Sequence, residues 1–292
     1  MPVTASGFFD MHVHGGGGAS FGDDVEANRI AAAWHRSHGT DGMLASLVTL
    51  APDDMLNAVR VLADMAGAQG ISGIHLEGPW LSPRYAGAHD PRLLRDPDLA
   101  ELERLLDAGA GHIRMVTIAP ELPSAMPAIE LLTARGVVAA VGHTDATYVQ
   151  TLQAISAGAT VATHLFNAMR PIHHREPGPI PALLESPAVT IELIADGVHI
   201  HPATYRMVLA AVGPDRIALV TDAMCAAGMP DGAYQLGHLP VTVTSGEARL
   251  TDGTIAGSTA SMADLYGFAA TQADAEIASL QTSVNPRRAV GF

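Results

Sequence analysis

The chain contains no lysine, and all 16 residues counted as Lys or Arg are arginines. The absence of lysine excludes a Schiff-base aldolase, a Walker A phosphate loop and a metal pair bridged by a carbamylated lysine. If two metal ions are bridged in this protein, a carboxylate must provide the bridge, and Glu77 is the candidate.

Cysteine and long apolar runs are also scarce. Cys225 is the only cysteine, so no intrachain disulfide can form. No apolar run is long enough to cross a bilayer, and the N-terminus lacks a basic segment followed by an apolar one, so we expect a cytoplasmic protein without membrane contact. The net charge of -14 disfavours nonspecific binding to nucleic acid.

The 292 residues, of which 48% are apolar, suffice for one large core, and we expect a single domain over 1–292. Apolar runs predict strands at 7–13, 42–48, 71–76, 112–118, 136–142, 159–163, 189–194 and 216–221. Helices are expected between them, near 24–38, 53–68, 98–109, 123–134, 146–157, 179–186 and 202–211. Eight alternating strands favour a (β/α)8 barrel of the α/β class over an open doubly wound sheet. Beyond them, 233–256 is β-like and 259–275 is helical in pattern.

Five of these apolar runs lead directly into side chains that bind metals or transfer protons. They are 7–11 before His12 and His14, 71–76 before Glu77, 137–141 before His143, 159–162 before His164, and 217–220 before Asp222. A parallel barrel brings the carboxyl ends of its strands to one rim, so residues far apart in sequence can meet there. The pattern therefore predicts a hydrolytic metal centre, which needs imidazoles and carboxylates around an ion with a position left open for water.

Each of these residues also has a less specialised interpretation. His12 and His14 share a face of their strand and can reach one ion, or they can simply pack at the strand end. Glu77 can be a solvated loop acid, or with two imidazoles it gives the three protein ligands of a catalytic zinc site. Asp222 can accept a proton from water or hydrogen-bond a neighbouring loop. We expect His75 to face away from the ligands around Glu77.

The chain also contains several longer motifs: HLEGP at 75–79, GAH at 87–89, GHTDATY at 142–148, THLFNAM at 163–169, HHREPG at 173–178, ADGVH at 195–199, TDAM at 221–224 and AGST at 256–259. Together they resemble the N-acetylglucosamine-6-phosphate deacetylase family of the amidohydrolase superfamily. The resemblance runs from about residue 7 to 291. It implies a metal-dependent hydrolase that converts N-acetylglucosamine 6-phosphate into glucosamine 6-phosphate and acetate.

The resemblance also implies roles for individual residues. Glu77, His143 and His164 would hold a catalytic divalent ion, with a second ion possible at His12 and His14. Zinc is the expected metal, with iron, manganese and cobalt as alternatives. Asp222 would act as base and then acid, and His89 would bind the sugar and polarise the amide carbonyl. The sugar phosphate would also contact Asn167, Ala168, Arg175 and His199, and a guanidinium suits a phosphate dianion.

Members of this family usually form homodimers and carry a small β-sandwich built from segments on both sides of the barrel. We expect this chain to form a dimer in which the Arg175 loop reaches toward the partner's pocket. Both halves of the sandwich are missing from the pattern, so we expect the barrel alone. Two other interpretations stay open: an amidohydrolase that acts on a different N-acyl or cyclic amide, and an inactive shortened homologue that serves as a scaffold.

Overall fold

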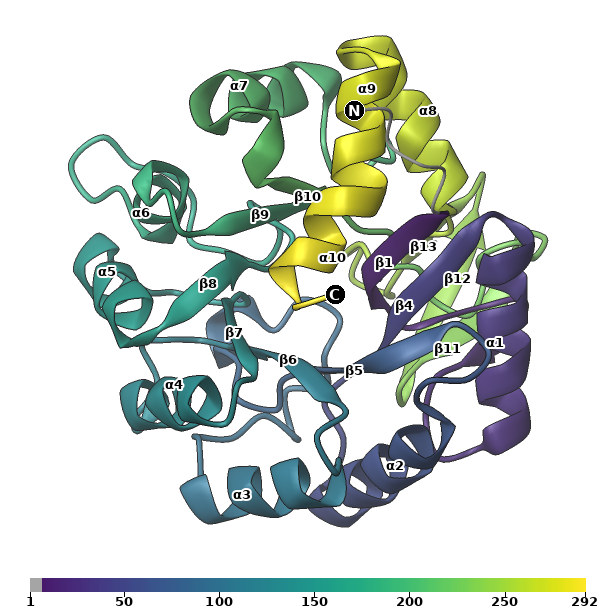
Figure 1. The fold of residues 1–292 in the computed structure, drawn as a ribbon, viewed down its shortest axis with the longest axis horizontal. Coiled ribbons are helices and arrows are strands. Elements are labelled where there is room, and N and C mark those ends of the chain that lie inside the picture. Colours follow the sequence, from purple (N-terminus) through teal and green to yellow (C-terminus); the bar gives the residue numbers. More distant parts are fainter. Residues whose placement is uncertain (1–6) are drawn as a thin grey trace.

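The computed structural model describes residues 7–292, which fold around an eight-stranded parallel sheet (Figure 1). In sheet order its strands are β1 (Phe8–Val13), β4 (Thr40–Leu47), β5 (Ile71–Glu77), β6 (Ile113–Ile118), β7 (Val138–Val141), β8 (Ala159–Ala162), β9 (Thr190–Leu193) and β10 (Ile217–Leu219). The Asp222 N–H donates to the His12 carbonyl over 2.9 Å, which joins the last strand's end to the first. The eight predicted strands are confirmed, and the sheet is a nearly closed (β/α)8 barrel rather than an open one.

Helices surround the barrel: α1 (Val25–Ser37), α2 (Pro52–Met65), α3 (Leu99–Ala108), α4 (Ala125–Ala134), α5 (Tyr148–Ala157), α6 (Pro179–Glu185), α7 (Pro202–Val212) and α8 (Met262–Gln272). Local sequence sets their starts. Asp24 and Asp98 accept backbone N–H bonds as N-caps of α1 and α3, and Thr147 opens α5 with a capping box. The predicted helix over 259–275 is wrong at its end, because Asp274 caps a separate helix, α9 (Ala275–Ser279).

Side chains alternate between the two faces of each strand. Outward residues such as Leu76 and Val116 pack with the helices in the larger apolar cluster. A second cluster fills part of the barrel interior. It consists of Phe9, Met11, Leu44, Met115, Ala140, Val161, Ile194, Ala218, Val220 and Val290. Toward the carboxyl end of β5, His75 and then Glu77 lie on the inward face of the strand. The interior is therefore apolar at one end and polar at the other.

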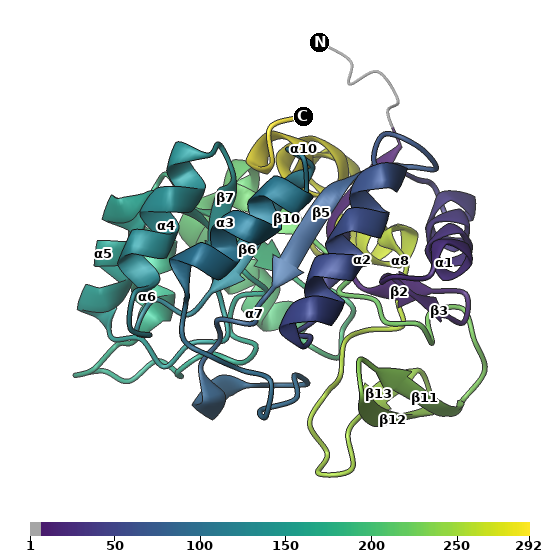
Figure 2. The ribbon, with the colours of Figure 1, turned by 90° about the horizontal axis from the view of Figure 1, so that it is seen from below.

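The two ends of the barrel carry different structures (Figure 2). The small antiparallel sheet of β11 (Gly232–Leu236), β12 (Leu239–Thr244) and β13 (Glu247–Arg249) lies at one end, as the β-like pattern at 233–256 predicts. A π-helical turn (Leu280–Val284) and α10 (Asn285–Ala289) cover the other end. Within residues 7–292 there is no β-sandwich, and none of the helices there is long and apolar enough to span a bilayer.

Asn285 fixes this C-terminal segment to the barrel, and we predict that Asn285→Ala destabilises the fold. Its buried side-chain amide donates to the carbonyls of Pro214, at 2.8 Å, and Ile217, at 2.7 Å. Loss of both donors should lower the free energy of unfolding by about 2 kcal/mol. Urea denaturation measures this loss. Asn57→Ala, at an exposed asparagine, is the control and should change it by less than about 0.5 kcal/mol. Equal effects of the two substitutions would contradict the assignment.

Candidate functional site

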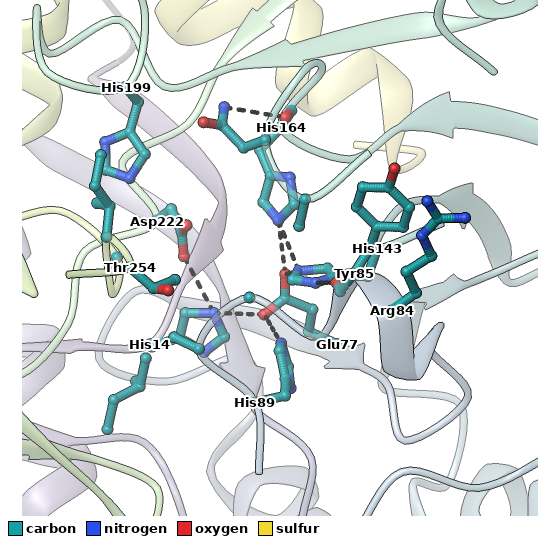
Figure 3. A pocket seen from close by; sticks show the side chains of 17 residues that line it. His14, Glu77, Arg84, Tyr85, His89, His143, His164, His199, Asp222 and Thr254 are labelled. Carbon is teal, nitrogen blue, oxygen red and sulfur yellow. Dashed lines mark hydrogen bonds and ion pairs between the residues drawn. The ribbon is translucent and has the colours of Figure 1, made fainter. Parts of the chain in front are cut away.

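A cavity of about 370 Å³ opens at the carboxyl end of the barrel strands. Its lining includes His14, Glu77, Arg84, Tyr85, Ala88, His89, His143, His164, Asn167, Ala168, His199, Asp222, Leu236 and Thr254. The side chain of Glu77 occupies the centre of this group, with imidazoles around it (Figure 3). The cavity therefore brings together nearly all of the site residues that the sequence predicts.

Glu77, His143 and His164 form the first possible ligand set. Glu77 Oε1 lies 3.1 Å from His143 Nε2 and 3.0 Å from His164 Nε2, and the two nitrogens are 3.0 Å apart. Metal bonds of about 2.0–2.1 Å in a tetrahedral site separate the ligand atoms by roughly 3.3 Å. The three atoms therefore have nearly the spacing of ligands around one small cation.

His12, His14 and Asp222 form a second possible ligand set on the other side of Glu77. His14 Nε2 lies 3.2 Å from His12 Nε2 and 3.2 Å from Asp222 Oδ1. Glu77 faces this set as well, because its Oε2 is 3.1 Å from His14 Nε2 and its Oε1 is 3.4 Å from His12 Nε2. One carboxylate thus lies between two sets of donors, which is the position of a bridging ligand.

The hydrogen-bond partners of the imidazoles indicate their tautomers. His14 Nδ1 donates to the Ser46 carbonyl at 3.2 Å, and His143 Nδ1 donates to the Tyr85 carbonyl at 2.9 Å. In the neutral ring each Nε2 then carries a lone pair directed at the centre of the site, as metal binding requires.

His89 has the opposite tautomer. Its Nδ1 accepts the backbone N–H of Thr49 at 3.2 Å, so its proton lies on Nε2, which donates to Glu77 Oε2 at 3.1 Å. Burial outweighs the nearby Glu77 charge and lowers the pKa of His89 to about 4. At neutral pH His89 is therefore an uncharged hydrogen-bond donor facing the cavity, rather than a ligand with a free lone pair.

The carboxylates make this end of the barrel attractive to positive charge. Burial alone would raise the pKa of Asp222, but the neighbouring His12 and His14 lower it to about 2, so the group is ionised at neutral pH. Burial would likewise lower the pKa of His14, but hydrogen bonds to Asp222 and Glu77 raise it to about 9. The side chains together favour a cation between them, and a divalent metal ion fits this donor set.

Three of these residues have a left-handed backbone conformation, with φ of 45° at His143, 26° at His164 and 47° at Asp222. For residues other than glycine the left-handed backbone conformation is unfavourable, with a free-energy cost of about 1–2 kcal/mol per residue. Each lies just after a barrel strand, where the chain turns out of the sheet. The turn directs the side chain over the barrel axis, and backbone strain of this kind is concentrated at functional sites.

The structure corrects one expectation, the orientation of His75, and it places Arg175 outside its own cavity. His75 does not face away from the ligands: it lies on the same strand face as Glu77, and its ring is 4.5 Å from that of His12. It is held there by Ser46 Oγ, at 2.9 Å, and Thr117 Oγ1, at 2.8 Å. Arg175 is exposed on a loop outside the cavity of its own chain and contacts His174.

Arg84 and Glu192 are among the residues near the site that the sequence prediction does not include. Arg84 lines the cavity and pairs with Asp145 at 2.9 Å, but it follows a proline in a loop without a distinctive pattern. Glu192 is completely buried in β9 and lies 3.2 Å from His12 Nδ1. The sequence does carry a signal for it, because this carboxylate lies between the buried apolar residues Ile191 and Leu193.

Comparisons with known proteins agree with this site. The chain matches the amidohydrolase family over residues 4–264. It is 37% identical to N-acetylglucosamine-6-phosphate deacetylase of Bacillus subtilis (strain 168), over 88% of this chain and 67% of that protein. It is 39% identical to N-acetylgalactosamine-6-phosphate deacetylase of Escherichia coli O157:H7, over 87% of this chain and 69% of that protein.

Solved structures are also similar. N-acetyl-D-glucosamine-6-phosphate deacetylase from Mycobacterium smegmatis superposes with a TM-score of 0.96 at 50% identity, covering 100% of this chain and 82% of that one. An aspartate-to-alanine mutant of that enzyme, solved in complex with N-acetyl-D-glucosamine-6-phosphate, gives a TM-score of 0.97 at 51% identity, covering 100% and 81%. The chain therefore belongs to the amidohydrolase family, in the group of the N-acetylglucosamine-6-phosphate deacetylases.

Proposed function

We propose that this protein is a metal-dependent deacetylase that hydrolyses N-acetylglucosamine 6-phosphate to glucosamine 6-phosphate and acetate. The observation that carries the proposal is the meeting of Glu77 with His143 and His164 in a cavity where the ionised Asp222 also lies. The similar proteins named above supply the substrate class. The activity belongs to amino sugar metabolism, and we place the protein in the cytoplasm.

Glu77, His143 and His164 would hold a divalent ion, and His12 and His14 a second one. When bound, such an ion polarises the amide carbonyl and increases the acidity of water. We propose zinc, because the nitrogen and oxygen donors suit it, although iron, manganese and cobalt accept the same ligands.

Asp222 is the residue that moves protons in this proposal. As an ionised carboxylate at the cavity wall it accepts a proton from water while the water oxygen bonds to the acetamide carbon. It then returns that proton to the sugar nitrogen as the C–N bond breaks, so that acetic acid and the amine leave, and the acid ionises to acetate by passing its remaining proton to the amine or to solvent. The Asp222 carboxylate ends as it began.

His89 would stabilise the negative charge that develops on the acetamide oxygen. Its Nδ1 is fixed by Thr49, which holds the Nε2–H at the cavity wall before the substrate binds; there it donates to Glu77 Oε2 until the substrate oxygen replaces that acceptor. Preorganised donors of this kind stabilise a transition state without the cost of reorienting during the reaction.

The remaining cavity residues would bind the sugar phosphate. Asn167, Ala168 and His199 line the cavity, and Asp196 orients His199 through a 2.7 Å hydrogen bond to its Nδ1. Arg175 lies outside its own chain's cavity, so we propose that it reaches the phosphate in the partner chain of a homodimer. N-acetylgalactosamine 6-phosphate is the second candidate substrate, because a relative of similar identity is named for it.

We expect Asp222→Asn to lower the rate of acetate release by about 10²- to 10⁴-fold, because the amide cannot accept the proton. Acetate released from N-acetylglucosamine 6-phosphate measures the effect, with the metal content determined on the same sample. Asp53→Asn, at an exposed aspartate, serves as the control and should be fully active. Full activity of Asp222→Asn would remove this residue from the mechanism.

The two ligand sets should respond differently to mutation. His164→Ala should abolish turnover and release the metal equivalent of the first set, because that set is left with two ligands. His12→Ala should remove at most one of two metal equivalents, since the first set is intact. Elemental analysis after gel filtration gives the stoichiometry of each variant. Turnover retained by His164→Ala, or loss of both equivalents from His12→Ala, would overturn the assignment of the ligand sets.

Arg175→Ala should raise the KM for the phosphorylated substrate by about ten- to a hundredfold, because a charge-assisted hydrogen bond contributes about 1.5–3 kcal/mol. A mixed dimer tests the action across chains: Arg175→Ala chains and Asp222→Asn chains, each weak alone, should regain activity when combined. Arg84→Ala is the comparison, because Arg84 lines the cavity of its own chain. If Arg84→Ala alone raises the KM and mixing restores nothing, Arg175 does not bind the phosphate.

A further inference from the structure

Glu192 is a buried carboxylate that the proposed mechanism does not use. It projects from β9 into the barrel and has no solvent exposure. Within residues 7–292 its only ion-pair partner is His12, and no arginine neutralises it. A buried carboxylate is costly unless it is paired, and among the described side chains this pairing falls to His12.

The contacts of Glu192 connect it to both ligand sets. Its Oε2 accepts from His12 Nδ1 at 3.2 Å and from the backbone N–H of His164 at 3.1 Å. Its own carbonyl accepts the N–H of Leu165 at 2.9 Å. Glu192 therefore contacts the ring of His12, which belongs to the second set. It also binds the backbone of His164, which belongs to the first set and has a φ of 26°.

His12 differs from the other ligand histidines in the nature of this partner. His14 and His143 donate Nδ1–H to neutral backbone carbonyls, whereas His12 donates to a carboxylate. Such a partner fixes the tautomer with the lone pair on Nε2 and makes that nitrogen a stronger ligand. His12 Nε2 lies 3.4 Å from Glu77 Oε1 and 3.5 Å from Asp222 Oδ1, so it faces the region between the two carboxylates.

The other oxygen of Glu192, Oε1, is buried and has no hydrogen-bond partner among the described residues. A carboxylate placed to stabilise the barrel alone would be expected to use both of its oxygens. The single side chain that Glu192 binds is His12, which points to a role at the site rather than in the fold.

We propose that Glu192 is a positioning residue for the second metal ion: it orients His12 and increases the affinity of the set formed by His12, His14 and Asp222. This inference rests on the metal dependence in the proposed function. Partners of this kind typically contribute 10- to 100-fold to metal affinity.

The test is a calorimetric titration of the metal-free chain with Zn²⁺ alone. The unfolding temperature of the metal-free chain is measured as well. The wild-type chain should bind two equivalents. Glu192→Gln keeps an acceptor oxygen for His12 and His164 but removes the charge, so we expect about tenfold weaker binding of the second equivalent only. Glu192→Leu removes the acceptor too and should weaken the second equivalent by up to about a hundredfold, and the first by less.

Asp196→Asn is the matched control, because Asp196 accepts from His199 Nδ1 and not from a ligand histidine. It makes the same change of carboxylate to amide and should leave both affinities for Zn²⁺ unchanged. Two equivalents bound with unchanged affinity by both Glu192 variants would overturn the proposal, as would a wild-type chain that binds one.

A purely structural role would give another pattern. Both equivalents would then weaken equally in Glu192→Gln, and the unfolding temperature of the metal-free chain would fall, which also overturns the proposal. A wild-type chain that binds no Zn²⁺ at all would refute the proposed metal dependence itself. The two failures are therefore distinguishable.

Discussion

The whole site depends on the contacts between the Glu77 carboxylate and the imidazoles around it. Its Oε1 faces His143, His164 and His12, and its Oε2 faces His14 and His89. In a lysine-free chain it is also the group that can join two metal ions. Its burial is tolerable because imidazoles or cations surround it, since an unpaired charge there would cost several kcal/mol. Each neighbouring residue therefore either donates a hydrogen bond to Glu77 or presents a lone pair to an ion beside it.

The barrel makes this arrangement possible by bringing separate strand ends to one place. Glu77 ends β5, whereas His143, His164 and Asp222 follow other strands and turn inward through a left-handed backbone. The strain at these three positions is held by the surrounding hydrogen bonds, including those of Glu192 to the chain at His164 and Leu165. Partners such as the Tyr85 carbonyl and Thr49 then decide which imidazole accepts and which donates. Whether a histidine of this site can act as a metal ligand or as a hydrogen-bond donor thus depends on its hydrogen-bond partners and not on its residue type.

Much of this could be predicted from the sequence, because buried parallel strands are short apolar runs and their last residues share a rim. That reasoning located Glu77, His143 and Asp222. It failed where the information is three-dimensional. The period of two places His75 with Glu77, but only its partners Ser46 and Thr117 show that it lies inside the barrel. The position of the Arg175 loop outside its own cavity is compatible with the expected reach toward a partner chain, an expectation that came from the family resemblance and not from a local sequence signal.

The central claim is that ions held around Glu77 make this chain a deacetylase of N-acetylglucosamine 6-phosphate. The most direct measurement is acetate release by the wild-type chain as purified, after removal of metal with a chelator, and after return of Zn²⁺. We predict activity that is lost with the metal and restored with it, in proportion to the equivalents bound. Acetate release that persists in the metal-free chain would contradict it, and so would a metal-loaded, folded chain that releases no acetate.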